Sequence, residues 1–164
     1  MADNVTNVVF AGLGGQGVLK ASDIFAQVVL GQGVDVKKSE IHGMSQRGGS
    51  VTSDVRFGEQ VLSPMVPDGE ADYVVVLADE EVEASKRHVR AGGVLIPPTV
   101  VDVDELSNKK SFNVAMLGVL SAHLDIPEDR WLAAIRETLP AKFHDDNVKA
   151  FAAGRARGKA GMTL

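Results

Sequence analysis

The sequence of 164 residues contains no cysteine. This absence excludes disulfide bonds, a cysteine nucleophile and any iron–sulfur or all-thiolate zinc site held by this chain alone. Basic residues are outnumbered, 17 against 22 acidic ones, and the net charge of −5 argues against nucleic acid held by bulk charge. No apolar run approaches the roughly 18 residues that span a bilayer, and the polar start Met1–Asn4 lacks the pattern of a secretory signal. We therefore expect a soluble, cytoplasmic protein with neither a nucleic-acid nor a membrane partner.

What the chain does contain suits one folded domain. Hydrophobic residues make up 45% and charged residues 24%, which is an ordinary balance for a globular protein. The charge is uneven, because residues 141–164 hold five basic and two acidic side chains, whereas the rest of the chain is acidic. We expect a single domain over residues 1–154 and a basic C-terminal tail over residues 155–164. The tail is either frayed in solvent or in contact with an acidic partner subunit.

Strands and helices alternate along most of the chain. Residues 8–11 form a short apolar run typical of a buried strand, and residues 18–30 carry apolar side chains at helical spacing. Residues 50–57 and 60–63 indicate a β-hairpin that turns at Gly58-Glu59. The alternation predicts a Rossmann-like, doubly wound α/β fold with a mainly parallel sheet and an inserted β-hairpin. Further strands are predicted at residues 34–40, 71–77, 94–96 and 100–103, and helices at 79–90, at 113–124 and beginning near 127 and 146.

A glycine-rich turn joins the first strand to the first helix and satisfies the pattern G-x-G-x-x-G. Glycines at such a turn allow positive φ and let an anion approach backbone amides at the start of the helix. Three interpretations remain open: dinucleotide binding with Glu40 as the ribose-binding acid, contact with the edge of a cofactor or anion, and a tight turn that binds nothing. The candidate cofactor-binding residues are Gly12, Gly14, Gly15, Gln16 and Gly17.

A second glycine-rich loop follows the second strand and leaves the same edge of a parallel sheet as the first. Arg47 has the planar fork that binds a carboxylate or phosphate in a bidentate manner, and His42 can exchange a proton near neutral pH. The alternative is a loop whose glycines serve only backbone geometry. The candidate active-site residues of this loop are His42, Gly43, Ser45, Gln46, Arg47, Gly48, Gly49 and Ser50.

The remaining candidates are weak. His88, His123 and His144 are scattered and no pair has metal-ligand spacing, so no metal site is expected. The sequence has no P-loop, no thiamine-binding Gly-Asp-Gly motif with a downstream Asn pair and no zincin motif. Gly118, inside the predicted helix 113–124, indicates a site of close helix packing. No catalytic residue can be assigned from these patterns.

At its two glycine-rich segments the chain resembles the gamma-type subunit of the 2-oxoacid:ferredoxin oxidoreductases. The resemblance rests on residues 10–17 and on the loop from Glu40 to Val51, and it extends along nearly the whole chain to residues 147–154. The loop lacks the Gly-Pro-Glu element before Arg-Gly that is typical of the pyruvate and 2-oxoglutarate branches. It is more similar to the indolepyruvate branch, and this similarity implies an aryl pyruvate as the substrate.

The resemblance also implies a division of labour among subunits. Members of the family oxidatively decarboxylate a 2-oxoacid with coenzyme A and give an acyl-CoA, carbon dioxide and electrons for ferredoxin. Thiamine diphosphate and iron–sulfur clusters reside on a larger, alpha-type companion subunit, so this chain is expected to bind no cofactor alone and to be inactive when isolated. His42, Gln46 and Arg47 would then line or support the substrate, thiamine or coenzyme A cavity. From the residues alone, a stand-alone Rossmann-type nucleotide-binding oxidoreductase and a non-enzymatic ligand-binding module remain alternatives.

Overall fold

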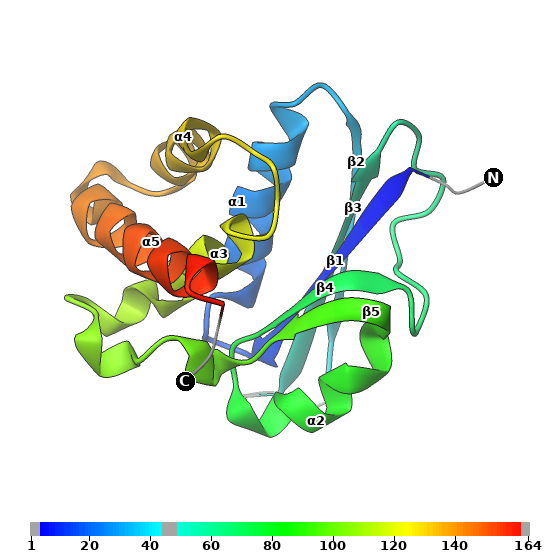
Figure 1. Ribbon diagram of the computed structural model, residues 1–164, viewed down its shortest axis with the longest axis horizontal. Helices are drawn as coiled ribbons and strands as arrows, with labels where there is room; N and C mark the ends of the chain where they lie inside the picture. The colour runs from blue at the N-terminus through cyan, green and yellow to red at the C-terminus, as the bar shows by residue number, and fades with distance from the viewer. Residues whose placement is uncertain (1–3, 44–48, 162–164) are drawn as a thin grey trace.

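The computed structural model describes residues 4–43 and 49–161, and within them one sheet is formed by β1 (Val5–Leu13), β2 (Asp35–His42), β3 (Ser50–Gly58), β4 (Ala71–Val76) and β5 (Val89–Ile96). The strands lie in the order β2-β3-β1-β4-β5 (Figure 1). β1 pairs with β4 and β4 pairs with β5 in parallel, whereas β3 runs antiparallel between β1 and β2. The predicted α/β fold is confirmed.

The antiparallel hairpin lies elsewhere than predicted. It consists of β2 and β3, in a register that runs from Asp35 opposite Gly58 to His42 opposite Val51. Residues 60–63, predicted as a return strand, form no strand. The reason is that β3 already has β1 on one edge and β2 on the other, so neither edge is left to pair with a further strand.

The segment after β3 is held to the sheet by carboxylates instead of by strand pairing. The Oδ2 atom of Asp35 accepts a hydrogen bond from the amide of Val61 at 2.8 Å, and Oδ2 of Asp54 accepts one from Val66 at 2.9 Å. Asp54 is only 6% exposed, and this burial raises the pKa of its carboxyl group. Side chains of the sheet therefore fix residues 59–70 without a backbone ladder.

Two layers of helix flank the sheet: α1 (Val18–Leu30), α3 (Phe112–Ser121), α4 (Glu128–Thr138) and α5 (His144–Lys159) on one face and the short α2 (Val82–Ser85) on the other (Figure 1). The bounds of α1 confirm the helix predicted there. The helix predicted over 79–90 shrinks to α2 with a 3₁₀ turn on either side, because Val89 already pairs with β4 as the start of β5. Residues 98–100 and 103–105 form 3₁₀ turns, so the predicted strand at 100–103 is wrong.

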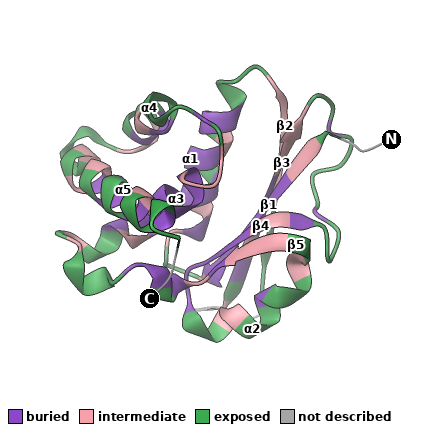
Figure 2. Cartoon of the chain, in the orientation of Figure 1, coloured by how far each residue is buried: buried purple, intermediate pink, exposed green. Residues whose placement is uncertain are grey.

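The main core lies between the sheet and the four-helix layer. A chain of aromatic rings runs through it: Phe10 lies 5.8 Å from Phe25, Phe25 lies 5.5 Å from Trp131, and Trp131 lies 5.8 Å from Phe151, measured between ring centroids. All four side chains are fully buried. Figure 2 colours α3 and parts of α1 in the same layer as buried. Neighbouring Val9 points to the α2 face and a smaller apolar cluster, because side chains alternate along a strand.

Helix α5 extends into the segment that the sequence assigns to a basic tail. Residues 155–159 are helical, and Gly154 and Gly158 pack against the backbone of α3. The Nη1 atom of Arg155 donates to the carbonyl of Ser121 at 3.2 Å and to its hydroxyl at 2.9 Å. Gly118 of α3 faces the α5 backbone, which confirms its predicted close packing. A tail beginning at residue 155 is therefore wrong, because the glycines let α5 continue in contact with α3.

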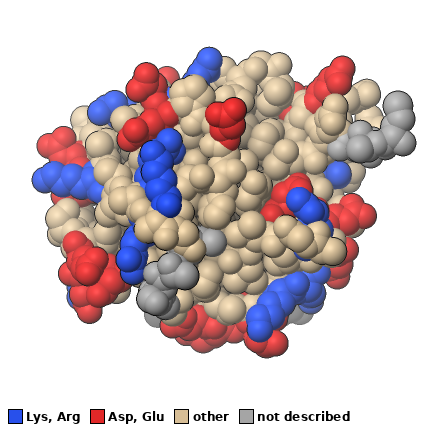
Figure 3. All heavy atoms as spheres, in the orientation of Figure 1, with Lys and Arg blue, Asp and Glu red and all other residues tan. Residues whose placement is uncertain are grey.

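Charged side chains of both signs are spread around the outline of the molecule in the view of Figure 3. The centre of that face is mostly uncharged. Across the described ranges, no helix combines the length and the apolar character that crossing a membrane requires.

Candidate functional site

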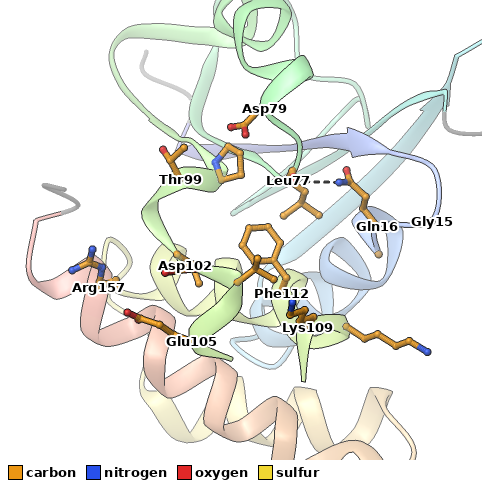
Figure 4. Close-up of a pocket in the computed structure, with 15 residues that line it drawn as sticks. Gly15, Gln16, Leu77, Asp79, Thr99, Asp102, Glu105, Lys109, Phe112 and Arg157 are labelled. Atoms are coloured by element: carbon orange, nitrogen blue, oxygen red, sulfur yellow. Dashed lines mark hydrogen bonds between the residues drawn. The ribbon is translucent and has the colours of Figure 1, made fainter. Parts of the chain in front are cut away.

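The glycine turn between β1 and α1 is the first part of the candidate site. Gly15 and Gly17 have φ of 88° and 82°, a left-handed conformation that glycine adopts without strain. The Oε1 atom of Gln16 accepts a hydrogen bond from the amide of Leu13 at 2.7 Å, and its Nε2 atom donates to the carbonyl of Leu77 at 3.3 Å (Figure 4). One side chain thus ties the turn to the end of β4.

The base of the second glycine loop contacts the first turn directly. The amide of Gly14 donates to the carbonyl of Gly49 at 2.9 Å, and the amide of Gly43 donates to the carbonyl of Ser50 at 2.6 Å. The Ser50 hydroxyl donates to Oε1 of Glu81 at 2.7 Å. The expectation that both loops leave the same edge of the sheet is confirmed for these residues.

Of the other predicted residues of this loop, the structure describes His42. His42 ends β2, with its side chain 59% exposed and its Nε2 atom 4.0 Å from Oε2 of Glu40. Ser45, Gln46, Arg47 and Gly48 lie outside the described residues. The role expected for Arg47 therefore stays a prediction.

Glu40 is not placed to bind the ribose of a dinucleotide at the glycine turn. It lies on β2, and β3 separates that strand from β1. Its carboxylate pairs with Lys38, which lowers the pKa of Glu40, and Lys38 also lies 3.0 Å from Asp23 of α1. A dinucleotide fold needs the acid on a strand beside the turn. The inserted β3 removes this support for dinucleotide binding.

A cavity of about 1030 Å³ lies beside the glycine turn (Figure 4). Residues 15–17, at the N-terminus of α1, form one wall, and Leu77 after β4 lies next to them. Residues 98–105, the turn before α3 and Arg157 of α5 supply other parts of the lining. The cavity therefore opens at the carboxyl ends of β1 and β4, the edge at which open α/β sheets bind ligands.

The cavity has an apolar middle with charged side chains around it. Three basic side chains and three acidic ones reach it, and Phe112 and Leu77 lie near each other in its middle (Figure 4). Such a lining suits a ligand with an anionic group and an apolar part. The basic residues are Lys109, Lys110 and Arg157, and the acidic residues are Asp79, Asp102 and Glu105.

Two basic side chains of the cavity lining have polar partners. The Nε atom of Arg157 donates to the carbonyl of Val100 at 3.2 Å and so ties α5 to the cavity wall. The Nζ atom of Lys109 lies 3.0 Å from Oδ1 of Asp104, in an exposed ion pair. Arg157 is therefore held in place, whereas Lys109 has its partner on the surface.

The histidines do not converge on this cavity. Burial lowers the pKa of His123 and of His88, whose Nδ1 atom lies 3.6 Å from Oδ1 of Asp68. Within residues 4–43 and 49–161, no three side chains of the metal-binding types are grouped so that they could hold an ion.

Comparison with known proteins identifies the family. Residues 7–157 match the family model described as pyruvate ferredoxin/flavodoxin oxidoreductase. The chain belongs to this family. The resemblance inferred from the two glycine loops is thereby confirmed.

Several relatives of the pyruvate ferredoxin/flavodoxin oxidoreductase family show how far the similarity extends. The indolepyruvate oxidoreductase subunit IorB of Thermococcus kodakarensis is 34% identical, over 90% of this chain and 93% of the relative. The 2-oxoglutarate synthase subunit KorC of Archaeoglobus fulgidus is 26% identical, over 93% of this chain and 88% of its own length. The alignment to IorB spans 190 positions, more than the 164 residues of this chain, so the relative carries insertions.

Solved structures of the family share the fold. The gamma subunit of a keto/oxoacid ferredoxin oxidoreductase from Geobacter sulfurreducens superposes with a TM-score of 0.81 at 22% identity, over 94% of this chain and 99% of that one. A 2-oxoglutarate:ferredoxin oxidoreductase from Magnetococcus marinus gives 0.80 at 20% identity, over 96% of this chain but only 32% of that one. The same fold thus occurs both as a separate subunit and as a third of a longer family chain.

Most of the cavity lining was missed by reasoning from the sequence. Lys109 and Lys110 belong to no motif, and they reach the cavity because the chain turns before α3. Arg157 was assigned to the tail, and the basic excess of residues 141–164 was the only signal that marked it. The family motifs locate the glycine turn but say nothing of the wall opposite to it.

Proposed function

We propose that this chain is the small subunit of a cytoplasmic 2-oxoacid:ferredoxin oxidoreductase that acts on an aryl pyruvate such as indolepyruvate. The complex oxidatively decarboxylates the 2-oxoacid with coenzyme A, gives an acyl-CoA and carbon dioxide, and transfers two electrons to ferredoxin. Identity is 30% to 34% to four relatives named indolepyruvate oxidoreductase subunit IorB, each matched over at least 92% of its length. It is 30% to a ketoisovalerate oxidoreductase subunit VorA over 35% of that longer chain, 26% to a 2-oxoglutarate synthase subunit KorC and 24% to a pyruvate synthase subunit PorC. The four matches along nearly the whole length of IorB support the indolepyruvate branch.

The redox groups belong on a larger companion subunit in this proposal. The chain has no cysteine to ligate an iron–sulfur cluster and no Gly-Asp-Gly motif for thiamine diphosphate, so its residues do not fit these two groups. In the ketoisovalerate oxidoreductase subunit VorA of Methanothermobacter marburgensis, this unit makes up 35% of a longer chain. Such fusion supports a close association of the unit with the remainder of the enzyme.

The observation that carries the proposal is the hydrogen bond from Gly14 to Gly49, which joins the two family-typical loops into one surface beside the cavity. We assign this surface to the companion subunit, so that Gly12–Gly17 and the loop that contains Arg47 face the shared active site. The first amides of α1, together with Lys110 and Arg157, would bind an anionic group of a substrate. Both the carboxylate of the 2-oxoacid and the phosphates of coenzyme A are such groups.

The test is to produce the chain with and without a larger subunit of the family, with thiamine and ferredoxin motifs, from the same organism. We expect the two chains to purify together and the complex to reduce a viologen dye with indolepyruvate and coenzyme A, whereas the isolated chain shows no turnover. A panel of 2-oxoacids that includes pyruvate and 2-oxoglutarate gives the substrate preference. Turnover by the isolated chain would contradict the assignment of the redox groups to a larger subunit. A preference for pyruvate would contradict the assignment to the indolepyruvate branch.

A calorimetric titration of the isolated chain with NAD and with FMN separates this proposal from a stand-alone Rossmann enzyme. We expect no heat of binding, because β3 separates Glu40 from the glycine turn. Micromolar binding of either cofactor would favour the stand-alone enzyme instead.

A further inference from the structure

Asn113, the second residue of α3, is the clearest polar contact between the glycine turn and the opposite side of the cavity. Its side chain is buried, with 8% of the residue exposed, and its Nδ2 atom donates to the carbonyl of Gly17 at 3.1 Å. Asn113 does not line the cavity, but Phe112, the residue before it, does. The contact joins residues 96 positions apart in the sequence.

The carbonyl of Gly17 sets the direction of the first amide of α1. It accepts the first hydrogen bond of α1, from Ala21 at 2.9 Å, as well as the bond from Asn113. In a trans peptide the carbonyl and the following N–H point in opposite directions, so fixing this carbonyl fixes the amide of Val18. That amide is one of the donors that a helix start leaves without a partner in the helix.

Packing around Gly17 is as restrictive as the hydrogen bond. Gly17 caps α1 in a left-handed conformation, with no side-chain cap of its own. A Cβ atom at this position would lie 2.5 Å from Nδ2 of Asn113, closer than non-bonded atoms approach. The amide group of Asn113 therefore rests directly on the turn and leaves it no room to move toward α3.

The turn is thus held from two directions. Gln16 ties it to Leu77 at the end of β4, and Asn113 ties it to α3, directly after the segment that carries Lys109 and Lys110 into the cavity lining. Of these two anchors, Gln16 itself lines the cavity, whereas Asn113 acts only through the residues that it contacts.

We propose that Asn113 is a positioning residue that fixes the separation between the amides of the glycine turn and the lysines of the cavity wall. This inference rests on the proposed function, in which these two walls bind the anionic group of a substrate. Loss of the Asn113 amide leaves every cavity-lining side chain in place but frees the turn. Binding of an anion between the walls is then weakened without a change in the groups that touch it.

Asn147 offers a matched control. It is also 8% exposed, lies in the first turn of α5 and donates from Nδ2 to a main-chain carbonyl, that of Phe143, at 2.8 Å. It is not part of the cavity lining. Asn→Ala at either position removes a buried amide donor of the same kind and adds no charge, so the two variants have a similar structural cost and differ in whether the lost contact reaches the cavity.

The experiment compares Asn113→Ala with Asn147→Ala in the complete complex. We expect Asn113→Ala to raise the KM for the 2-oxoacid or for coenzyme A by about fivefold, the change in affinity that corresponds to one neutral hydrogen bond. The value of kcat should change by less than about twofold, because the reacting groups are untouched. Asn147→Ala should leave both constants at the wild-type value.

A second measurement does not depend on activity. The isolated full chain is titrated with pyrophosphate, and binding is followed through the amide resonances of residues 15–20. We expect Asn113→Ala to bind pyrophosphate about fivefold more weakly than Asn147→Ala. If Asn113→Ala matches Asn147→Ala in both measurements, the inference is overturned. An inactive wild-type complex whose isolated chain still shows Asn113-dependent pyrophosphate binding would remove the proposed function and leave the inference standing.

Discussion

Replacing Gly154 by alanine tests the close packing of α5 on α3. In an exposed helix, Gly→Ala stabilises by about 1 kcal/mol because it reduces the backbone freedom that folding must restrict. Here the new Cβ would collide with the carbonyl of Ala115 and lie against the Ala115 backbone. No side-chain rotation can relieve a collision with main-chain atoms, so the two helices must move apart.

The expected loss of stability follows from the cost of overpacking a close-packed interior, which is about 1 to 3 kcal/mol. We expect Gly154→Ala to lower the free energy of unfolding by about 2 kcal/mol. In a chain of this length, that corresponds to a fall of about 4 to 8 °C in Tm. Circular dichroism during thermal and urea unfolding of the isolated chain measures both quantities.

The control lies on the same helix. Ala153 is exposed on α5, and Ala153→Gly should lower the free energy of unfolding by about 1 kcal/mol through helix propensity alone. Propensity and packing thus predict opposite signs for Gly154→Ala. A Tm above that of the wild type would show that α5 and α3 are not in backbone contact and would refute the reasoning.

Two further substitutions test the turn and the segment after β3. Gly15 and Gly17 share a positive φ, but a Cβ at Gly15 meets nothing within 4 Å, whereas one at Gly17 meets Asn113. Urea unfolding should therefore show a loss of about 1 kcal/mol for Gly15→Ala and of more than about 2 kcal/mol for Gly17→Ala; equal losses would contradict the contact. Burial raises the pKa of Asp54 above its ordinary value of 3.8, so the folded state binds the proton of this carboxyl group more tightly than the unfolded state does. The free energy of unfolding therefore falls as the pH rises from 3.8 through the raised pKa of the folded state. Asp54→Asn keeps an acceptor for Val66 and should raise the free energy of unfolding at neutral pH but not below pH 3.8, and urea unfolding across the pH range detects this difference.

Local patterns in the sequence were sufficient for several elements. Helix α1 begins and ends at the predicted residues, because glycines bound its apolar spacing on both sides. The glycine turn and the strand β4 followed from the same kind of signal. The predicted hairpin failed because alternation shows which face of a strand is buried and not which strand lies beside it. Residues 60–63 follow a plausible two-residue turn, but β3 has no free edge for them.

The sequence by itself determined the family, the α/β class and the glycine turn at the end of β1, since each depends on residues close together in the chain. The absence of cysteine also excluded a redox group bound by thiolates of this chain. Only the tertiary structure decided that β3 separates β1 from β2, that α5 continues through Arg157 to the cavity and that Asn113 rests on Gly17. These features join residues far apart in the sequence, and their positions depend on how the sheet and helices pack, which no local pattern encodes.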